Sequence, residues 1–533
     1  MKTFCCVAIV TLCFVCSAHA ASVYSGCATP PTTFRHVWYF DPVNGKTNAA
    51  GGNGSQAAPW NNLQALIQAE PGYSYPLLTS APYRQVPVPG QPAVTQTGPN
   101  AGPIQPGDEI LLMSGNYGDV FIGGLTAEVA NTDFVTVAAA PGQTPVLTSL
   151  FVGETNAWVF NGLKVQSLQP AARSGNALLQ IKDAGASLPT SDIVLVNMTV
   201  SSADSTAGWS QALWVANARN GFSAISTTGG ANTKCVSFSG SHIANVRNGA
   251  VLFANQTLFS NNQIDHFGDD GIDYAANNLA ITKNNLHDNL DIGDGNHEDA
   301  MQGQIGSLAA GSTVNRFQNI FIDSNLIVRQ TDPALSFPTV LQGIDAFDSD
   351  WTNVTVTNNV VITSACWGIA FSSIHNGLIA NNTVAEDGLV ATQGCVANVA
   401  VGDTTHQGSS SNNVVMRNNL ASQVQITTPV TSVEADHNVA MTAGFSPTLV
   451  MYVNGVVQFF GKPGAYPNSN IIDAGGPKSE FVNFNPATLT YNLMLKAGAQ
   501  AIGAATATGA PTLDIFAVPR SAPYTAGAYG YPY

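Results

Sequence analysis

The chain has 533 residues, of which only 10% are charged, and its formal net charge at pH 7 is −15. This acidic balance argues against nucleic acid as a partner, because nucleic-acid-binding domains need a basic surface. Few charges together with 50 glycines are typical of a β-rich repeat protein, a class in which one domain grows by repetition beyond the usual domain size.

The first twenty residues have the pattern of a secretory signal peptide. Lys2 precedes an apolar run at residues 4–15, and the small residues Ala18 and Ala20 mark a cleavage site. No later stretch has the roughly 20 uninterrupted apolar residues that a membrane helix needs. We therefore expect a secreted protein, extracellular or periplasmic, that is a monomer and has no membrane span.

Four cysteines follow the signal peptide, namely Cys27, Cys235, Cys366 and Cys395. Their spacing matches no zinc-binding pattern. In an exported protein, a disulfide between Cys366 and Cys395 is one interpretation, and reduced cysteines in the core are the other. The sequence leaves the pairing open.

A short phrase recurs along the chain: an apolar residue, two residues, an asparagine, one residue, and then a small or apolar residue. Several neighbouring copies lie 22 or 23 residues apart. This period is one turn of a parallel β-helix, in which each turn of chain stacks about 4.8 Å above the last. The asparagines are expected to form a structural ladder, because their side chains bond turn backbone and one another. They are Asn161, Asn197, Asn262, Asn284, Asn325, Asn359, Asn382 and Asn419.

The period predicts an all-β fold, a right-handed parallel β-helix. After the signal peptide at residues 1–20, we expect an N-terminal capping entry with a proline- and glycine-rich insertion at 21–134. The coils then occupy residues 135–440, and a closing segment rich in glycine and alanine occupies residues 441–533.

Segments near both ends carry a resemblance that periodicity alone does not supply. Residues 38–45, 59–65 and 106–112, taken in this order, resemble the opening of bacterial right-handed β-helix proteins of the pectate-lyase-like superfamily, which includes alginate-active enzymes. Residues 501–503 and 519–529 are similar to the closing segment of many such proteins. The resemblance implies the β-helix fold and action on a polysaccharide.

Two adjacent turns are longer than the others. In most coils, the last residue of the asparagine phrase is followed eight positions later by the apolar residue of the next strand. The corresponding gaps before Met301 and Ile344 are longer by seven and nine residues. Both insertions, at residues 288–296 and 330–338, fall in the same turn of the coil. We expect them to protrude side by side and to wall a groove.

Aligning the strands behind these turns stacks residues 269–273 on 298–302, then on 341–345 and 366–370. Alternation then points Ile272, Met301, Ile344 and Ile369 inward. The polar ladder that results is outward-facing Asp273, Gln302 and Asp345, with Asp270, Asp299 and Gln342 at its edge. Carboxylates one or two coils apart would be about 5 or 10 Å apart. Such pairs raise at least one pKa and offer the acid and base that glycosidic hydrolysis needs.

Asp270 on one coil and Glu298 with Asp299 on the next resemble the acids of the polygalacturonase family, a single Asp followed by an Asp pair on the next coil. This chain has Gln342-Gly343 where that family has Gly-His-Gly, and no matching Arg-x-Lys follows. From its central place we predict Asp299 as general acid, with Asp270 or Asp273 as the opposing carboxylate. The structural alternative is that the aspartates only satisfy turn backbone.

Several further residues are candidates near the groove. His297 is a catalytic base, a glycan-binding donor or an exposed loop residue, while Gln302, Gln342 and Asp345 would contact substrate. Trp367 and Trp351 offer sugar-stacking surface. Asp291 and Asp294 offer hard oxygen ligands, so calcium is a candidate cofactor.

Two other functions stay open at this stage. A polysaccharide lyase acting on uronates needs a cation to neutralise the substrate carboxylate, supplied by calcium or by Lys283 or Arg316. A non-catalytic solenoid that only binds glycans is the third class. Product analysis separates the three.

Overall fold

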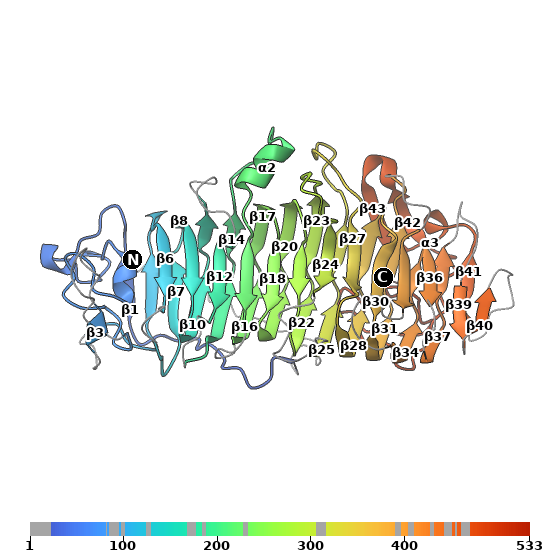
Figure 1. Ribbon diagram of the computed structural model, residues 1–533, viewed down its shortest axis with the longest axis horizontal. Helices are drawn as coiled ribbons and strands as arrows, with labels where there is room; N and C mark the ends of the chain where they lie inside the picture. Colours follow the sequence, from blue (N-terminus) through green and yellow to red (C-terminus); the bar gives the residue numbers. More distant parts are fainter. Residues whose placement is uncertain are drawn as a thin grey trace, which may run out of the picture.

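The computed structural model describes residues 23–81, 83–84, 95–96, 102–123, 129–167, 177–183, 188–226, 233–304, 316–389, 396–402, 410–426, 431–441, 450–453, 456–459 and 469–532. The described chain forms the predicted right-handed parallel β-helix. Three parallel sheets of 13, 13 and 11 strands run along an elongated body (Figure 1). No helix among the described residues has the length and apolar character that a membrane crossing requires.

Each turn of the solenoid contributes one strand to each sheet. Sheet 1 consists of β1 (Val37–Phe40), β4 (Glu109–Leu112), β7 (Val135–Ala139), β10 (Asn156–Asn161), β13 (Ser191–Val196), β16 (Lys234–Ser239), β19 (Asn255–Ser260), β22 (Leu279–Thr282), β25 (Arg316–Asp323), β28 (Asp350–Thr357), β31 (Ile374–Ala380), β34 (Asn412–Arg417) and β37 (Thr431–Asp436). Sheet 2 consists of β5 (Gly115–Asn116), β8 (Pro145–Leu147), β11 (Lys164–Gln166), β14 (Thr199–Ser201), β17 (His242–Val246), β20 (Gln263–Phe267), β23 (Asn285–Asn289), β26 (Leu326–Val328), β29 (Val360–Thr363), β32 (Thr383–Glu386), β35 (Leu420–Ala421), β38 (Val439–Met441) and β41 (Ile471–Asp473).

Sheet 3 consists of β6 (Asp119–Ile122), β9 (Ser149–Val152), β12 (Leu179–Lys182), β15 (Phe222–Ile225), β18 (Ala250–Phe253), β21 (Ile272–Tyr274), β24 (Asp299–Gly303), β27 (Gln342–Ala346), β30 (Trp367–Ser372), β33 (Asn398–Gly402) and β36 (Gln423–Ile426). Three antiparallel pairs lie outside these sheets: β2 (Tyr83–Arg84) with β3 (Thr95–Gln96), β39 (Val450–Val453) with β40 (Val456–Phe459), and β42 (Phe481–Asn485) with β43 (Thr490–Leu495). The α-helices are α2 (Gln211–Asn217) and α3 (Pro477–Glu480), and short 3-10 turns occupy Asn48–Ala50, Leu63–Leu66 and Pro486–Thr488.

The core is a continuous stack of apolar side chains that point inward from all three sheets. Because side chains alternate along a strand, every second one points inside. Because the coils repeat with one period, apolar side chains at equivalent positions stack on one another. The predicted core isoleucines are fully buried, each with 0% of its surface exposed: Ile264, Ile272, Ile281, Ile344 and Ile369. The prediction of the coil interior is therefore confirmed.

An asparagine ladder, defined as Asn262, Asn284, Asn325, Asn359, Asn382, Asn419, Asn438 and Asn470, lines the corner between sheets 1 and 2. Each member repeats the same hydrogen bonds. The amide of Asn325, for example, donates to Asn359 Oδ1 at 2.9 Å and to the Ile281 carbonyl at 2.9 Å, and its Oδ1 accepts the backbone N–H of Asn284 at 2.9 Å. The ladder is structural, as predicted.

Two asparagines of the predicted ladder lie outside it. Asn197 adopts a left-handed backbone at φ 54° on the corner and donates to Asn161 at 2.9 Å in an exposed contact. In its coil the ladder position belongs to Met198, whose N–H donates to Ser241 Oγ. In these coils the asparagine of the recurring sequence phrase is therefore not the ladder residue. It occupies the neighbouring left-handed position at the corner, which asparagine also favours.

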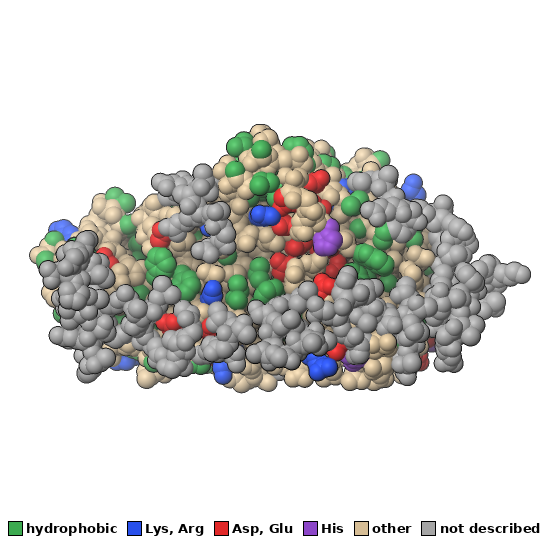
Figure 2. Space-filling model, viewed as in Figure 1, with side chains coloured by type: hydrophobic (Ala, Val, Ile, Leu, Met, Phe, Trp, Pro, Cys, Tyr) green, Lys and Arg blue, Asp and Glu red, His purple; other side chains and the backbone are tan. Residues whose placement is uncertain are grey.

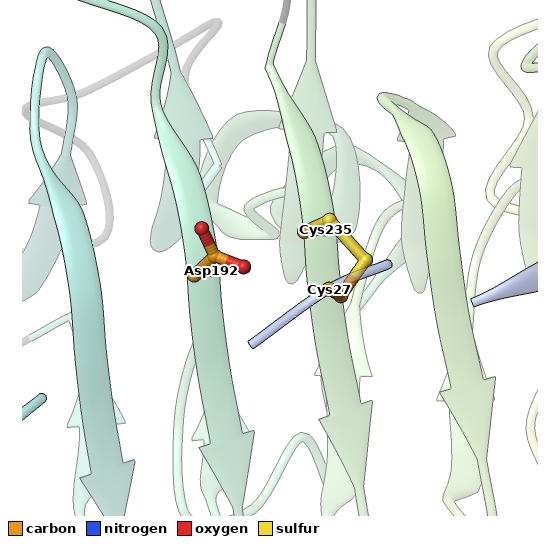
Figure 3. A group of neighbouring side chains, drawn as sticks. All are labelled: Cys27, Asp192 and Cys235. Carbon is orange, nitrogen blue, oxygen red and sulfur yellow. A yellow bond between two sulfur atoms is a disulfide. The ribbon is translucent and has the colours of Figure 1, made fainter. Parts of the chain in front are cut away.

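The two ends of the described chain fold back onto the solenoid. Residues 23–28 cross the outer face of sheet 1, where Cys27 forms a disulfide with Cys235 on β16 (Figure 3). Val23 packs on Phe321 of the same face. Cys366 is also disulfide-bonded, while its predicted partner Cys395 lies outside the described residues. The closing residues after Phe481 pack on the outer face of sheet 2.

Candidate active site

Three insertions, not two, form one wall along the edge between sheets 2 and 3. Figure 1 shows α2 projecting from this edge. The two predicted insertions, at residues 288–296 and 330–338, are in contact, because the N–H of Asp291 donates to the Phe337 carbonyl at 2.8 Å. They therefore lie side by side as expected. The third insertion carries α2, whose Trp214 shares an apolar cluster with residues of the other two, and Gln211 donates to the Asp291 carbonyl at 2.9 Å.

The strand register behind the wall is the predicted one. Asp273 on β21 pairs with Gln302 on β24, and Gln302 pairs with Asp345 on β27. Asp299 pairs with Gln342 along the edge. The outward column that contains Asp273 continues one coil back to Val251. Asn248, three residues before Val251, donates to Asp273.

These residues form an acidic cluster, defined here as Asp269, Asp270, Asp273, Glu298, Asp299 and Asp345. Figure 2 shows acidic side chains gathered in the middle of this face, with a basic side chain on one side and a histidine on the other. All six are buried, with at most 7% of each residue exposed. Burial of so many carboxyl groups is costly unless they share protons or pair with cations.

Asp299 and Asp345 are the innermost pair of the acidic cluster. They are 0% and 1% exposed, and their carboxyl groups interact electrostatically with each other. No N–H or O–H donor of the described residues reaches either carboxyl group. Burial raises the pKa of Asp299 to about 6 and the pKa of Asp345 well above its ordinary value, with the Asp299 charge adding to the latter. Burial and the repulsion between the two carboxyl groups therefore favour the protonated form of Asp345.

Asp270 and Asp273 form a second pair beside the insertion wall. Burial, with the neighbouring Asp273 and Asp299 charges, raises the pKa of Asp270 to about 10. Burial also raises the pKa of Asp273 to about 6. Asp273 Oδ1 accepts from Gln304 at 2.9 Å, and its Oδ2 accepts from Asn248 at 3.3 Å. Asp273 stands on the outward face of β21, where it borders the groove.

At the rim of the acidic cluster, one basic side chain forms ion pairs with two carboxylates. The Arg247 guanidinium contacts Asp269 at 3.3 Å and Asp294 at 2.5 Å. Glu298 accepts from Thr339 at 3.0 Å, and burial raises its pKa to about 7. These contacts tie the cluster to the insertion wall on both sides.

His297 is the exposed titratable group of the site. Its side chain is 61% exposed, and its Nδ1 lies 3.4 Å from Asp299 Oδ2. The contact joins a solvent-facing imidazole to a buried carboxyl, an arrangement that orients the ring.

The structure does not bring every predicted residue to the cluster. Lys283 lies in the turn between β22 and β23, at a different corner of the coil. Arg316 begins β25 beyond the far edge of sheet 3 and contacts Asp350 at 3.3 Å. Trp351, expected as groove surface, is 0% exposed in the core. Trp367 begins β30, half-buried, with its ring 5.6 Å from Phe347.

The predicted calcium ligands Asp291 and Asp294 are engaged elsewhere. Asp294 contacts Arg247, and Asp291 Oδ1 accepts the N–H of Gly293 at 2.7 Å. Among the described residues, the one group of three potential ligand atoms within 4.8 Å of one another is Cys27, Asp192 and Cys235, whose sulfurs form the disulfide (Figure 3). The buried oxygens of Asp299 and Asp345 have the chemistry of hard-cation ligands, but the carboxyls converge as pairs rather than on one point.

Comparison with known proteins identifies no family for this chain. No family model and no curated protein matches the chain. Among solved structures, pectate lyase Pel9A is 14% identical, with 97% of this chain and 100% of that chain covered and a TM-score of 0.34. A PL6 alginate lyase in complex with a trisaccharide is 10% identical, covering 68% of this chain and 87% of that chain, with a TM-score of 0.34.

Proposed function

We propose that the protein is a secreted hydrolase that cleaves glycosidic bonds of a polysaccharide in the groove on sheet 3. The observation that carries this proposal is the buried acidic cluster beside the insertion wall, where Asp273 lies on the outward column of sheet 3 and burial raises its pKa to about 6. An open groove admits a polymer at any point along its length. The Cys27–Cys235 disulfide supports an oxidising, exported location.

Asp273 is the proton donor in this proposal. A general acid must be protonated near the working pH and must reach the leaving oxygen. Asp273 has a pKa of about 6 and faces outward from β21, with Asp270 holding a second proton behind it. Asp299, the acid predicted from its position in the sequence, is fully buried. We therefore assign it an indirect role.

His297, oriented by Asp299, is the base. Its exposed ring takes a proton from a water molecule, and the water oxygen attacks the anomeric carbon as the glycosidic bond breaks. The leaving oxygen takes the proton from Asp273. Asp299 fixes the orientation of the ring and stabilises the imidazolium that forms, as a buried carboxylate does in other histidine-dependent hydrolases.

Elimination is the second candidate, and the His297 contact is the observation that favours it. An imidazole backed by a carboxylate also removes a carbon-bound proton from a uronate. Arg247 at the rim is the nearest basic group to the cluster and would neutralise the substrate carboxylate.

A panel of soluble plant, algal and bacterial polysaccharides tests the proposal, with and without added calcium. A hydrolase releases new reducing ends without ultraviolet absorbance, whereas a lyase releases unsaturated products that absorb. Hydrolysis that is lost in Asp273→Asn and His297→Ala supports the proposal. Unsaturated products, or no cleavage of any polysaccharide, contradict it.

A further inference from the structure

We infer that the substrate is an uncharged polysaccharide, held along the outer face of sheet 3 by an aromatic platform at Phe121 and Phe151. The inference rests on the proposed function for the position of the groove, and it names the chemical class of the ligand. It is carried by the side chains that the strand register places in line with Asp273.

One outward column connects the platform to the acidic cluster. Each coil contributes one residue to it, and neighbouring strands pair in register along the whole length. From the N-terminal end, the column is Phe121, Phe151, Gln180, Ser223, Val251, Asp273, Gln302, Asp345 and Ala370. Five coil steps separate Phe121 from Asp273, roughly 24 Å at the spacing of neighbouring strands. A polysaccharide of several sugars spans this distance.

The platform presents apolar rings to solvent from a fixed backbone. Phe121 is 45% exposed, and its ring lies 6.1 Å from that of Phe151. The side-chain amide of Gln64 clamps the Phe121 backbone, donating to its carbonyl and accepting from its N–H at 3.0 Å each. A Cβ on Gly153 would lie 2.8 Å from the Phe151 ring, so glycine leaves room for that ring. Rigid exposed aromatics of this kind stack on the apolar faces of sugar rings.

The charges of the same face select against polyanions. Lys182 is the only basic residue in the eleven strands of sheet 3, which carry four acidic residues: Asp119, Asp273, Asp299 and Asp345. A polyuronate carries a negative charge on every sugar and needs matching cations along its path. The column offers the half-buried Gln180 and Gln302 instead, side chains that exchange hydrogen bonds with hydroxyl groups. Figure 2 shows hydrophobic side chains on both sides of the acidic cluster.

Native gel electrophoresis of the full chain, in gels that contain a soluble polysaccharide, tests this inference without requiring turnover. The probes are neutral β-glucan, glucomannan and xyloglucan, compared with polygalacturonate and alginate, each with calcium and with a chelator. The variants are Phe121→Ala with Phe151→Ala, and Lys182→Gln. Phe516→Ala is the matched control, because Phe516 is 58% exposed outside the groove.

We expect at least one neutral polysaccharide to retard the protein, with little dependence on ionic strength. The double variant should bind at least about tenfold more weakly, while Lys182→Gln and Phe516→Ala behave as the parent protein. Three results would overturn the inference: retardation by polyuronates alone, loss of neutral binding in Lys182→Gln, or neutral binding that does not change in the double variant. Retardation by no probe overturns it as well. Binding without cleavage would instead contradict only the proposed hydrolysis.

Discussion

The asparagine ladder and the acidic cluster are built by the same repeat and differ in how their polar atoms are satisfied. Both stack polar side chains from one coil to the next, and both are buried. In the ladder each amide has complementary donors and acceptors above and below it. In the cluster, Asp299 and Asp345 have only each other and the nearby His297. The difference indicates that the ladder stabilises the fold, while the cluster buries carboxyl groups whose pKa values are raised, as the proposed function requires.

The largest effect that we expect is on stability, from Asn325→Ala in the ladder. The substitution leaves the Ile281 carbonyl and the Asn284 N–H buried without their partners, which should lower the free energy of unfolding by about 3 kcal/mol or more. Urea unfolding measures the change. Asn197→Asp is the control and should stay within about 0.5 kcal/mol, because that side chain is exposed and aspartate also tolerates the left-handed backbone at this position. Equal losses in the two variants would contradict the distinction between them.

Asp273→Asn in the acidic cluster should have the opposite result, a loss of activity without a loss of stability. The amide keeps the shape of the side chain but cannot donate the acid proton, so turnover should fall by roughly 10²-fold or more. Thermal melting should show no loss of stability, because a costly buried acid has been removed. Asp204→Asn, at a side chain that is 79% exposed, should have normal turnover. An active Asp273→Asn variant would remove this residue from the chemistry.

A smaller loss of turnover is expected for Asp299→Asn. This side chain acts only through His297, which keeps its exposed ring. The amide also removes one carboxyl group of the buried pair, so the melting temperature at neutral pH should rise. Turnover as low as in Asp273→Asn, with a lowered melting temperature, would show that Asp299 has a different role.

The smallest effect concerns pH. Burial raises the pKa of Asp273 and Asp299 to about 6, above their ordinary 3.8, and that of Glu298 to about 7, above its ordinary 4.5. The folded state therefore holds more protons than the unfolded state between about pH 4 and pH 7, and stability falls as pH rises through this window.

The melting temperature of Asp345→Asn should fall less steeply with pH than that of the parent, because one buried pair of carboxyl groups is gone. His266, whose pKa is raised chiefly by its hydrogen bond to Asp265, acts in the same direction in both proteins. The comparison of the two slopes therefore isolates the cluster. Parallel slopes would mean that the Asp299 and Asp345 pair does not titrate in this window.

The interior of the coil and the position of the cluster were predictable because the period fixes both. Once Ile272, Met301 and Ile344 are aligned, the register of their acidic neighbours follows. The insertion with α2, between Val200 and Phe222, was missed because Met198 and Ser241 hold the ladder positions of its coil and the next one, so no ladder asparagine marks either coil.

Other features depend on three-dimensional contacts that no local pattern carries. The disulfide joins cysteines 208 residues apart, through a segment that returns across sheet 1. Trp351 belongs to the core because Phe317 and Tyr274 enclose it. The interaction between carboxyl groups on neighbouring coils depends on how their side chains are oriented. The spacing of the carboxylates in the sequence does not determine that orientation.

Cleavage in water labelled with heavy oxygen tests the central claim most directly. Hydrolysis adds one water oxygen to each new reducing end, so mass spectrometry should find one labelled oxygen in every chain released from a neutral polysaccharide, and Asp273→Asn should release almost none. Elimination adds no water to the broken bond. Products that carry an unsaturated end and no label would contradict the account.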